Sequence, residues 1–505
     1  MTKKEQKMKT NTLSLLAFTG ALFLMTACAN EETNSKQEQA QKPDTKGLTA
    51  FVVNNGATRT TADYDGSGLN FYWTEGDRLW VNNGTLIQDN SNNITDLLTP
   101  NPKRSDAVKR AATARFYFSG TYTAPSYPVR YTGKNSTVGD KVIIKDQQAQ
   151  ALPNDAAHIG EDGDCGTGTA INSGGGYNFT LDHKASYLTL LPYSTINFSA
   201  AVKLTQVKIT ADEALSGQFN FNDSGIDLGS RPAPTPANRS ITLTLSGGGT
   251  NGFVIPVAAA KESNSPIMVL PPGTYNNVSI EYTLYDQFTT KTETIKKEYA
   301  TLTFVPGKNK KISTNLQMRS YITPMGYWRE FVGPNTNQAL WYIYRGDPHL
   351  DQTTIFAAKR SATSPANICL GGIWVKKAAK IPGFTGSNDP FGVNQIYYWE
   401  TYRVDGYSGY LSNMNNGNLG SLTIGIPANI SDYYFIPSVF GYNVVDGVSI
   451  KSGDGMIRYW VGTRFYGHMV QGNVFAVDIP PAVPSATIGV GCGYSTNIMA
   501  YWQAQ

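Results

Sequence analysis

Short runs of alternating apolar and polar residues recur between residues 48 and 317. In these runs β-branched and aromatic side chains alternate with polar ones, and turn-forming residues bound each run. The stretch AVKLTQVKITA (201–211) shows the pattern clearly. Comparable runs are LTAFVV (48–53), LNFYW (69–73), RLWVNN (78–83), ARFYFSG (114–120), KVIIKD (141–146), SGQFNF (216–221) and SITLTLS (240–246). The pattern predicts a mainly β fold built from sandwiches of short strands.

The strand pattern forms two series. The first covers residues 48–195 and contains a Gly-rich loop from Gly160 to Gly176. The second covers residues 196–317 and includes the turn sequence LPPGTY (270–275). In such a turn Pro presets φ and Gly permits a positive φ. We therefore expect two tandem β-sandwich domains with these bounds.

The composition changes at about residue 318. Six of the eight Trp and more than half of the Tyr lie beyond this point. Gly and Asn remain frequent there, while clean alternation becomes rarer. We therefore expect residues 318–505 to form a separate domain with more loop.

Residues 1–27 have the pattern of an export signal. Four Lys residues precede an apolar run at 13–27 that carries no charge. This run is shorter than the ~20 residues that span a bilayer as a helix. The segment Met25-Thr26-Ala27-Cys28 resembles the lipobox of bacterial lipoproteins, in which the peptide is cut before a cysteine that is then acylated. The resemblance implies a lipid anchor at Cys28 in the outer membrane; the alternative is an ordinary secretory signal.

A polar segment follows the lipobox. Residues 28–47 are rich in Gln, Lys, Glu, Asn and Thr and contain little to bury, which predicts a flexible tether. Asn30, Glu31 and Glu32 resemble the signal that sends lipoproteins to the cell surface in some Gram-negative bacteria. The resemblance implies surface exposure.

The charge and cysteine content narrow the function classes. The Lys and Glu residues of 1–27 account for +3 of the formal charge of +4, which leaves the rest near +1. Nucleic-acid-binding proteins favour clustered Lys and Arg, so no nucleic acid partner is expected. Cys165, Cys369 and Cys492 lie far apart without CxxC spacing, so we expect no metal site and no cofactor. Cys369 and Cys492 form a disulfide or remain buried thiols.

Several phrases occur in a fixed order along the chain. They are the lipobox cysteine and the segments ATRT (57–60), FYWTEGDRLWV (71–81), LDHKASYL (181–188), PGTY (272–275) and FVPGKNKKI (304–312). Together they resemble the fimbrillin family, the lipoprotein-derived subunits of type V pili and their anchor and tip relatives. The resemblance covers about residues 28–317. It implies two tandem fimbrillin-like β-sandwiches and partners that are other fimbrial subunits.

The resemblance also implies a processing step. In such subunits a trypsin-like protease cuts after an Arg and removes the first strand, and a donor strand from the next subunit fills the groove. An open groove exposes apolar surface and unpaired backbone groups, which favours strand addition. Here the first strand is Leu48–Asn54 and the processing site is Arg59, with Arg78 as the runner-up. The alternative is that Arg59 is a surface residue and the chain stays uncut.

The C-terminal region departs from the pattern of a stalk subunit, because the chain continues for another domain. This favours a tip or accessory subunit that accepts a strand and donates none. The segments YYFIPS (433–438), RYWVGTR (458–464) and IGVGCGY (488–494) loosely resemble the α+β C-type-lectin-like fold. The calcium-binding tripeptides of its sugar-binding members are missing, so the resemblance implies no calcium-dependent sugar binding.

The loop YRVDGYSGYLSNMNNGNLG (402–420) combines aromatic rings with amides and a carboxylate. Rings of this kind stack on apolar faces of sugars or peptides while polar groups bond hydroxyls. The expected ligand contacts, to an unknown glycan or protein, are Asp405, Tyr407, Tyr410, Asn413, Asn415 and Asn416. The alternative is that the aromatic residues belong to a core and the Asn and Gly residues to turns.

No catalytic motif stands out. The four His form no HExxH, and neither GxSxG nor a P-loop occurs. We therefore expect an adhesive fimbrial tip or accessory subunit with no catalytic residues and no enzyme activity. Two alternatives remain, a non-polymerising surface glycan-binding lipoprotein and a hydrolase carried on the C-terminal domain.

Overall fold

The structure is a computed structural model of the chain. It describes residues 45–53, 61–101, 108–322, 325–326, 336–388, 390, 423–438, 456–464, 471–478, 487–494 and 499–501. The predicted signal peptide and nearly all of the predicted tether lie outside these residues.

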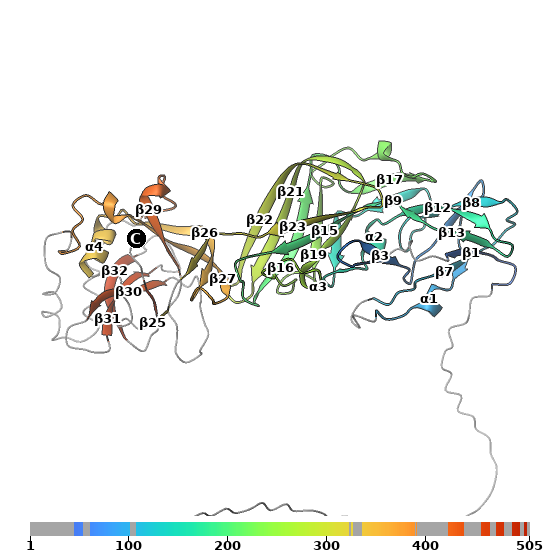
Figure 1. Cartoon of the computed structure of the whole chain (residues 1–505). Coiled ribbons are helices and arrows are strands. Elements are labelled where there is room, and N and C mark those ends of the chain that lie inside the picture. The colour runs from blue at the N-terminus through green and yellow to red at the C-terminus, as the bar shows by residue number, and fades with distance from the viewer. Residues whose placement is uncertain are drawn as a thin grey trace, which may run out of the picture. The chain divides into compact units, whose positions relative to one another are not determined.

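The fold is mainly β, as the alternating pattern predicts (Figure 1). The described helices are short. They are α1 (Ile94–Leu97), α2 (Ile159–Asp162), α3 (Lys261–Asn264), α4 (Thr336–Tyr344) and the 3-10 turns η1 (Leu228–Ser230), η3 (Ala378–Lys380) and η4 (Ile430–Asp432). Strands therefore provide the layers that enclose each core.

The first sheet is built mainly from strands of the predicted N-terminal sandwich. They are β1 (Thr49–Val53), β4 (Trp80–Asn82), β5 (Leu86–Gln88), β6 (Ser91–Asn92), β7 (Ala114–Phe118), β8 (Ser126–Tyr131), β12 (Gly166–Asn172), β13 (Tyr177–Phe179) and β14 (Asp182–His183). Among the described residues their order is β5-β4-β8-β12-β13-β1-β7-β6, with β14 beside β12. Ala114, Phe116 and Phe118 of β7 are buried and Arg115 is exposed, so the alternation of the sequence selects the inner face. Phe51, Trp73 and Tyr131 belong to the same core.

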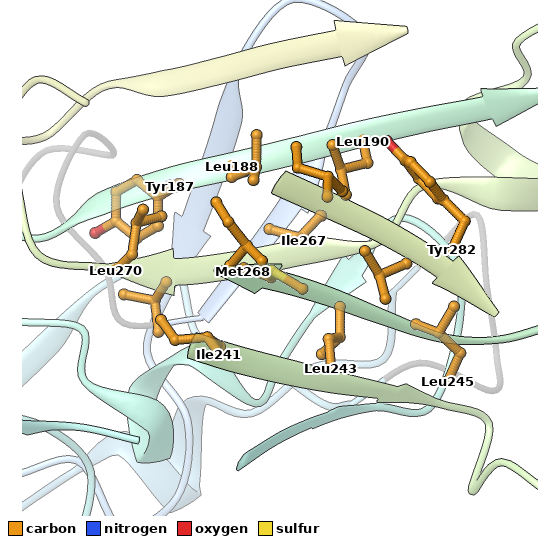
Figure 2. Packing of buried hydrophobic residues seen from close by; sticks show 14 of the residues in the cluster. Tyr187, Leu188, Leu190, Ile241, Leu243, Leu245, Ile267, Met268, Leu270 and Tyr282 are labelled. Atoms are coloured by element: carbon orange, nitrogen blue, oxygen red, sulfur yellow. The ribbon is translucent and has the colours of Figure 1, made fainter. Parts of the chain in front are cut away.

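A second and larger core lies between several smaller sheets. Its strands are β2 (Thr61–Tyr64), β3 (Leu69–Tyr72), β9 (Lys141–Ile144), β10 (Gln147–Gln150), β11 (Asp155–Ala156), β15 (Ser186–Tyr193), β16 (Val202–Thr210), β17 (Gly217–Asn222), β18 (Gly225–Ile226), β19 (Ser240–Leu245), β20 (Ile267–Leu270), β21 (Gly273–Asp286), β22 (Lys291–Phe304) and β23 (Asn309–Asn315). The described sheets are β10-β19-β16-β21-β22, β20-β15-β23, β18-β17-β9 and β11-β2-β3. Figure 2 shows Leu188 and Leu190 of β15 packed with Met268 of β20 and Leu243 of β19 in this core.

Strand pairing crosses the predicted boundary at residue 195. β15 precedes this residue, yet it pairs in parallel with β23 from Tyr187↔Asn309 to Tyr193↔Asn315. β9 and β10 also precede it, and they pair with β17 and β19. Alternation along a strand indicates which face is buried but not which distant strand is its partner. The sheets of the second core therefore take strands from both predicted sandwiches.

The described strands beyond residue 317 form two further sheets. Their bounds are β24 (Ser320–Ile322), β25 (Met325–Gly326), β26 (His349–Lys359), β27 (Ala366–Lys376), β28 (Thr423–Ile424), β29 (Tyr433–Pro437), β30 (Met456–Arg464), β31 (Gln471–Asp478), β32 (Thr487–Tyr494) and β33 (Met499–Tyr501). The sheet orders are β24-β26-β27-β29, with β28 beside β26, and β25-β33-β30-β31-β32. Phe356, Trp374 and Phe435 form a core in the first of them. This region therefore has sheets and a core of its own.

The β26–β27 hairpin joins this region to the second core. Ala357, Ala366 and Ile368 belong to that second core. The backbone N–H of Ile368 donates to Asp286 Oδ2 at 2.8 Å, and Thr289 Oγ1 donates to the Ile368 carbonyl at 2.6 Å. Because Asp286 is fully buried, these bonds fix the hairpin against the end of β21.

A buried carboxyl and a half-buried imidazole near α2 predict opposing pH effects on stability. Burial raises the pKa of Asp162 to about 6, although Lys145 Nζ lies 3.0 Å from its Oδ1. Burial, aided by the charge of Lys145, lowers the pKa of His158 to about 4. The raised carboxyl pKa makes stability fall as the pH rises from about 4 to about 6, because the folded state holds the proton longer. The lowered imidazole pKa makes stability rise from about pH 4 to about pH 6.5, because the unfolded state binds the proton first.

We expect Asp162→Asn to remove the contribution to stability that falls as the pH rises and to leave the contribution of His158, which rises. Its free energy of unfolding should increase by about 2 kcal/mol from pH 4 to pH 6.5, while the parent protein changes little. His158→Gln should show the opposite slope. Urea unfolding followed by circular dichroism across this window measures all three slopes, and equal slopes would contradict the assignment.

Candidate functional site

The candidate site is the place that β1 occupies between β7 and β13, here named the β1 slot. On one side β1 pairs antiparallel with β7, from Thr49↔Phe118 to Val53↔Ala114. On the other side it pairs in parallel with β13, from Phe51↔Tyr177 to Val53↔Phe179. β1 therefore lies in the interior of the sheet, with neighbours on both sides (Figure 1).

Two side chains of β1 anchor it in the N-terminal core. Phe51 and Val53 are both 0% exposed. The ring of Phe51 stacks on Tyr177 with centroids 4.7 Å apart, and it meets Phe118 edge-on at 5.0 Å. Burying each such apolar side chain contributes about 1.5–3 kcal/mol. The TAFVV alternation thus supplies two apolar anchors at positions i and i+2.

β1 also carries the continuity of the sheet. In the described strand order it lies between the group β5-β4-β8-β12-β13 and the pair β7-β6. Without β1, the facing edges of β7 and β13 would expose unpaired backbone N–H and C=O groups. Such edges bind added strands.

The Gly-rich loop before β13 allows β1 to approach closely. Gly176 has φ 158°, and a Cβ atom built there would lie 2.6 Å from the carbonyl oxygen of Ala50. The Ser173 N–H donates to the Gly176 carbonyl at 2.9 Å and closes the loop. Glycine at position 176 is therefore a condition for seating β1 against β13.

The runner-up processing site lies just before β4 of the same sheet. Arg78 Nε lies 3.0 Å from Asp89 Oδ1, and the Leu79 N–H donates to the same oxygen at 2.8 Å. Leu79 is 0% exposed. Burial raises the pKa of Asp89, and the hydrogen bonds from Leu79 and Arg78 oppose that rise. A protease would have to break this arrangement to reach the bond after Arg78.

The predicted site residues lie outside the described residues. They are Cys28, Arg59, Asp405, Tyr407, Tyr410, Asn413, Asn415 and Asn416. Their roles therefore stay predictions. Cys369 is buried in β27, while the side chain of Cys492 in β32 is outside the described set, so a disulfide between them also stays a prediction. In the described part of the chain, no helix has the length and apolar character needed to cross a membrane.

Sequence reasoning identified the strand at 48–54 but not the walls that receive it. Tyr177 and Phe118 line the slot, and Gly176 permits the approach. A glycine placed directly before the aromatic run YNF (177–179) was an available signal. The parallel pairing of β1 with β13 had no signal, because no periodicity links two strands so far apart in sequence.

None of the protein families compared matches this chain, and no curated protein does either. Among solved structures, it is similar to a candidate cell adhesion protein from Bacteroides ovatus, at 12% identity and TM-score 0.31, over 54% of this chain and 93% of that one. It is also similar to a fimbrial protein from Bacteroides ovatus at 12% identity and TM-score 0.20, over 90% of this chain and 98% of that one. A fimbrial anchor protein from Porphyromonas gingivalis matches at 8% identity and TM-score 0.18, over 50% and 83%. These distant neighbours are adhesion and fimbrial proteins, but sequence identities and TM-scores this low establish neither the family nor the function of this chain.

We expect Gly176→Ala to loosen β1, because the added Cβ would collide with the Ala50 carbonyl oxygen. Hydrogen exchange of the peptide covering β1 should accelerate at least about tenfold, equivalent to about 1.4 kcal/mol. Gly174→Ala is the matched control, since Gly174 also has a positive φ (82°) but a Cβ there meets nothing within 4 Å. Equal exchange of β1 in the two variants would show that position 176 does not control the seating.

Proposed function

We propose that this chain is an accessory or tip subunit of a bacterial fimbrium, held to the outer membrane by lipid at Cys28 until it is processed. In this proposal a protease cuts after Arg59, the fragment that carries β1 and the lipid leaves, and a strand from another subunit takes the place of β1. The observation that carries the proposal is the position of β1. A five-residue strand from the beginning of the described part of the chain fills an interior place in the sheet, and Arg59 follows it in the sequence.

The chemistry of the slot favours exchange of one strand for another. Departure of β1 would open the sites of Phe51 and Val53 and both neighbouring strand edges. Exposed apolar surface and unpaired backbone groups each favour a replacement. A replacing strand that runs parallel to β13, with apolar residues at positions i and i+2, would restore both the apolar packing and the backbone pairing.

Proteolysis explains how exchange starts. While the chain is intact, β1 is tethered to the slot, and its return is intramolecular at a high effective concentration. A cut after Arg59 makes the binding of β1 bimolecular. A competing strand can then displace β1 if it is present at higher concentration or makes better contacts. The slot therefore needs no conformational change other than loss of the tether.

The path of the chain after β23 supports an accepting and not a donating role. The chain continues from β23 into β24, which pairs in parallel with β26 through Ser320↔Ala357. The segment that would follow the second sandwich as a donor strand is thus part of the C-terminal sheet. In the proposal, the C-terminal region binds the ligand through the 402–420 loop, and the protein assembles and adheres without catalysing a reaction.

We expect brief digestion of the intact protein with an arginine-specific protease to produce a new N-terminus at Thr60. Arg59→Gln should prevent this cut, and Arg78→Gln should leave it unchanged, because Arg78 is held by Asp89. N-terminal sequencing of the products reads the result. First cleavage elsewhere, or none under conditions that leave the cores folded, would favour a lone surface lipoprotein that keeps β1.

We further expect the cut protein, and not the uncut protein, to bind a synthetic peptide of residues 48–54. A peptide carrying Phe51→Asp and Val53→Asp is the control, since it keeps the length but loses both anchors. Fluorescence anisotropy with labelled peptides measures the difference. Equal binding of both peptides would argue against a specific β1 slot.

A further inference from the structure

A cavity of about 360 Å³ lies against the β11-β2-β3 sheet, away from the β1 slot. Asp63 and Tyr72 of the β2–β3 hairpin, Asn101, Arg110 and Asn154 are among its lining residues. A volume of this size is in the range of small-molecule sites, about 300–1,000 Å³. Its residues differ from those at 402–420 to which ligand binding is assigned above.

Strand register places a row of polar side chains on the cavity face of this sheet. Asp155 of β11 is directly opposite Asp63 of β2, and Asp63 is directly opposite Asn70 of β3. Directly opposite residues of antiparallel strands point to the same face. The alternate residues Ala62 and Phe71 point the other way, into the second core. The core therefore holds the polar row in place from behind.

Arg110 organises the two neighbouring carboxylates. Its Nη1 lies 2.6 Å from Asp63 Oδ2 and its Nη2 lies 2.8 Å from Asp155 Oδ2, and its side chain is only 4% exposed. The guanidinium carbon lies 5.0 Å from the ring centroid of Tyr72. Because one cation meets two carboxylates, this trio keeps a net charge of about −1. The charge disfavours phosphate, sulfate or carboxylate groups in a ligand.

Several buried polar atoms of the lining residues are unsatisfied. Within the described part of the chain, Asp63 Oδ1 and Asn154 Oδ1 accept no hydrogen bond. Arg110 Nη1 donates none, since its contact with Asp63 is an ion pair without hydrogen-bond geometry. Each such buried atom costs about 1–3 kcal/mol. These atoms have less than 1 Å² of accessible surface each, so a ligand would instead meet the amide groups of Asn70 and Asn154 in the cavity lining. An amide group both donates and accepts, which matches a hydroxyl.

We propose that this cavity binds a neutral, hydroxyl-rich ligand, namely one or two sugar units of a glycan. Sugar hydroxyls would bond Asn70 and Asn154, while the ring of Tyr72 provides an apolar flank. A metal ion is a poorer match, because the described residues contain no group of three acidic, His or Cys side chains placed to hold one. The proposal does not depend on strand exchange at the β1 slot.

A glycan array probed with the detergent-solubilised full chain tests this proposal. Ala112→Trp should weaken binding of at least one neutral glycan by more than about tenfold, because Ala112 is exposed, lines the cavity and would fill it with an indole ring. Thr113→Trp is the matched control, since Thr113 is the next residue, is also exposed and is not part of the cavity lining. It should bind like the parent protein.

The same array separates the other outcomes. A glycan whose binding is unchanged by Ala112→Trp binds elsewhere on the chain. If Ala112→Trp changes the binding of no glycan on the array, the proposal is overturned. Absence of any neutral glycan among the ligands, or binding of anionic glycans alone, overturns it as well. Binding at the cavity should persist in roughly 0.5 M salt, because a neutral ligand is little affected by screening. A large loss there would indicate an ammonium ligand and would also refute the sugar assignment.

Discussion

The N-terminal sheet depends on one short strand whose removal would divide it. β1 connects β13 to β7, and its Phe51 and Val53 are fully enclosed by the core. Backbone pairing and apolar burial involve the same five residues, so the two interactions form together and are lost together. This coupling makes the folded sheet stable and makes the site specific for a strand. No other kind of ligand supplies a paired backbone and alternate apolar side chains together.

The second core is built in a way that resists exchange. Its strand β15 lies between β20 and β23, which come from later parts of the chain, and β9 and β10 are likewise paired to later strands. Removing β15 would divide its sheet, and removing β9 or β10 would take an edge strand from another sheet around the same core. The same core fixes the β2–β3 hairpin through Ala62, Tyr64 and Phe71, and it receives Ile368 of the C-terminal hairpin. It therefore packs against both the β2–β3 hairpin and the C-terminal hairpin.

Single strands were predictable from the sequence, whereas their partners were not. The runs 114–120 and 201–211 appear as β7 and β16, and the run 48–53 contains β1, because alternation reports directly on a half-buried strand. The parallel pairs β1–β13 and β15–β23 bring together residues far apart in sequence, which no local pattern encodes. The polar row of Asp155, Asp63 and Asn70 was missed for the same reason, since it exists only after three strands align. The residues predicted within 402–420 fall outside the described part of the chain.

Assembly and recognition would use different forces on separate surfaces. The β1 slot relies on apolar burial and backbone pairing in the first core, and the cavity relies on polar groups held by the second core. β1 and β2 follow one another in sequence, yet Phe51 packs in one core and Tyr64 in the other. A cut between them would leave β2 paired with both β3 and β11. Replacement of β1 by another strand would therefore leave the floor of the cavity intact. Strand exchange at the β1 slot need not disturb ligand binding in the cavity.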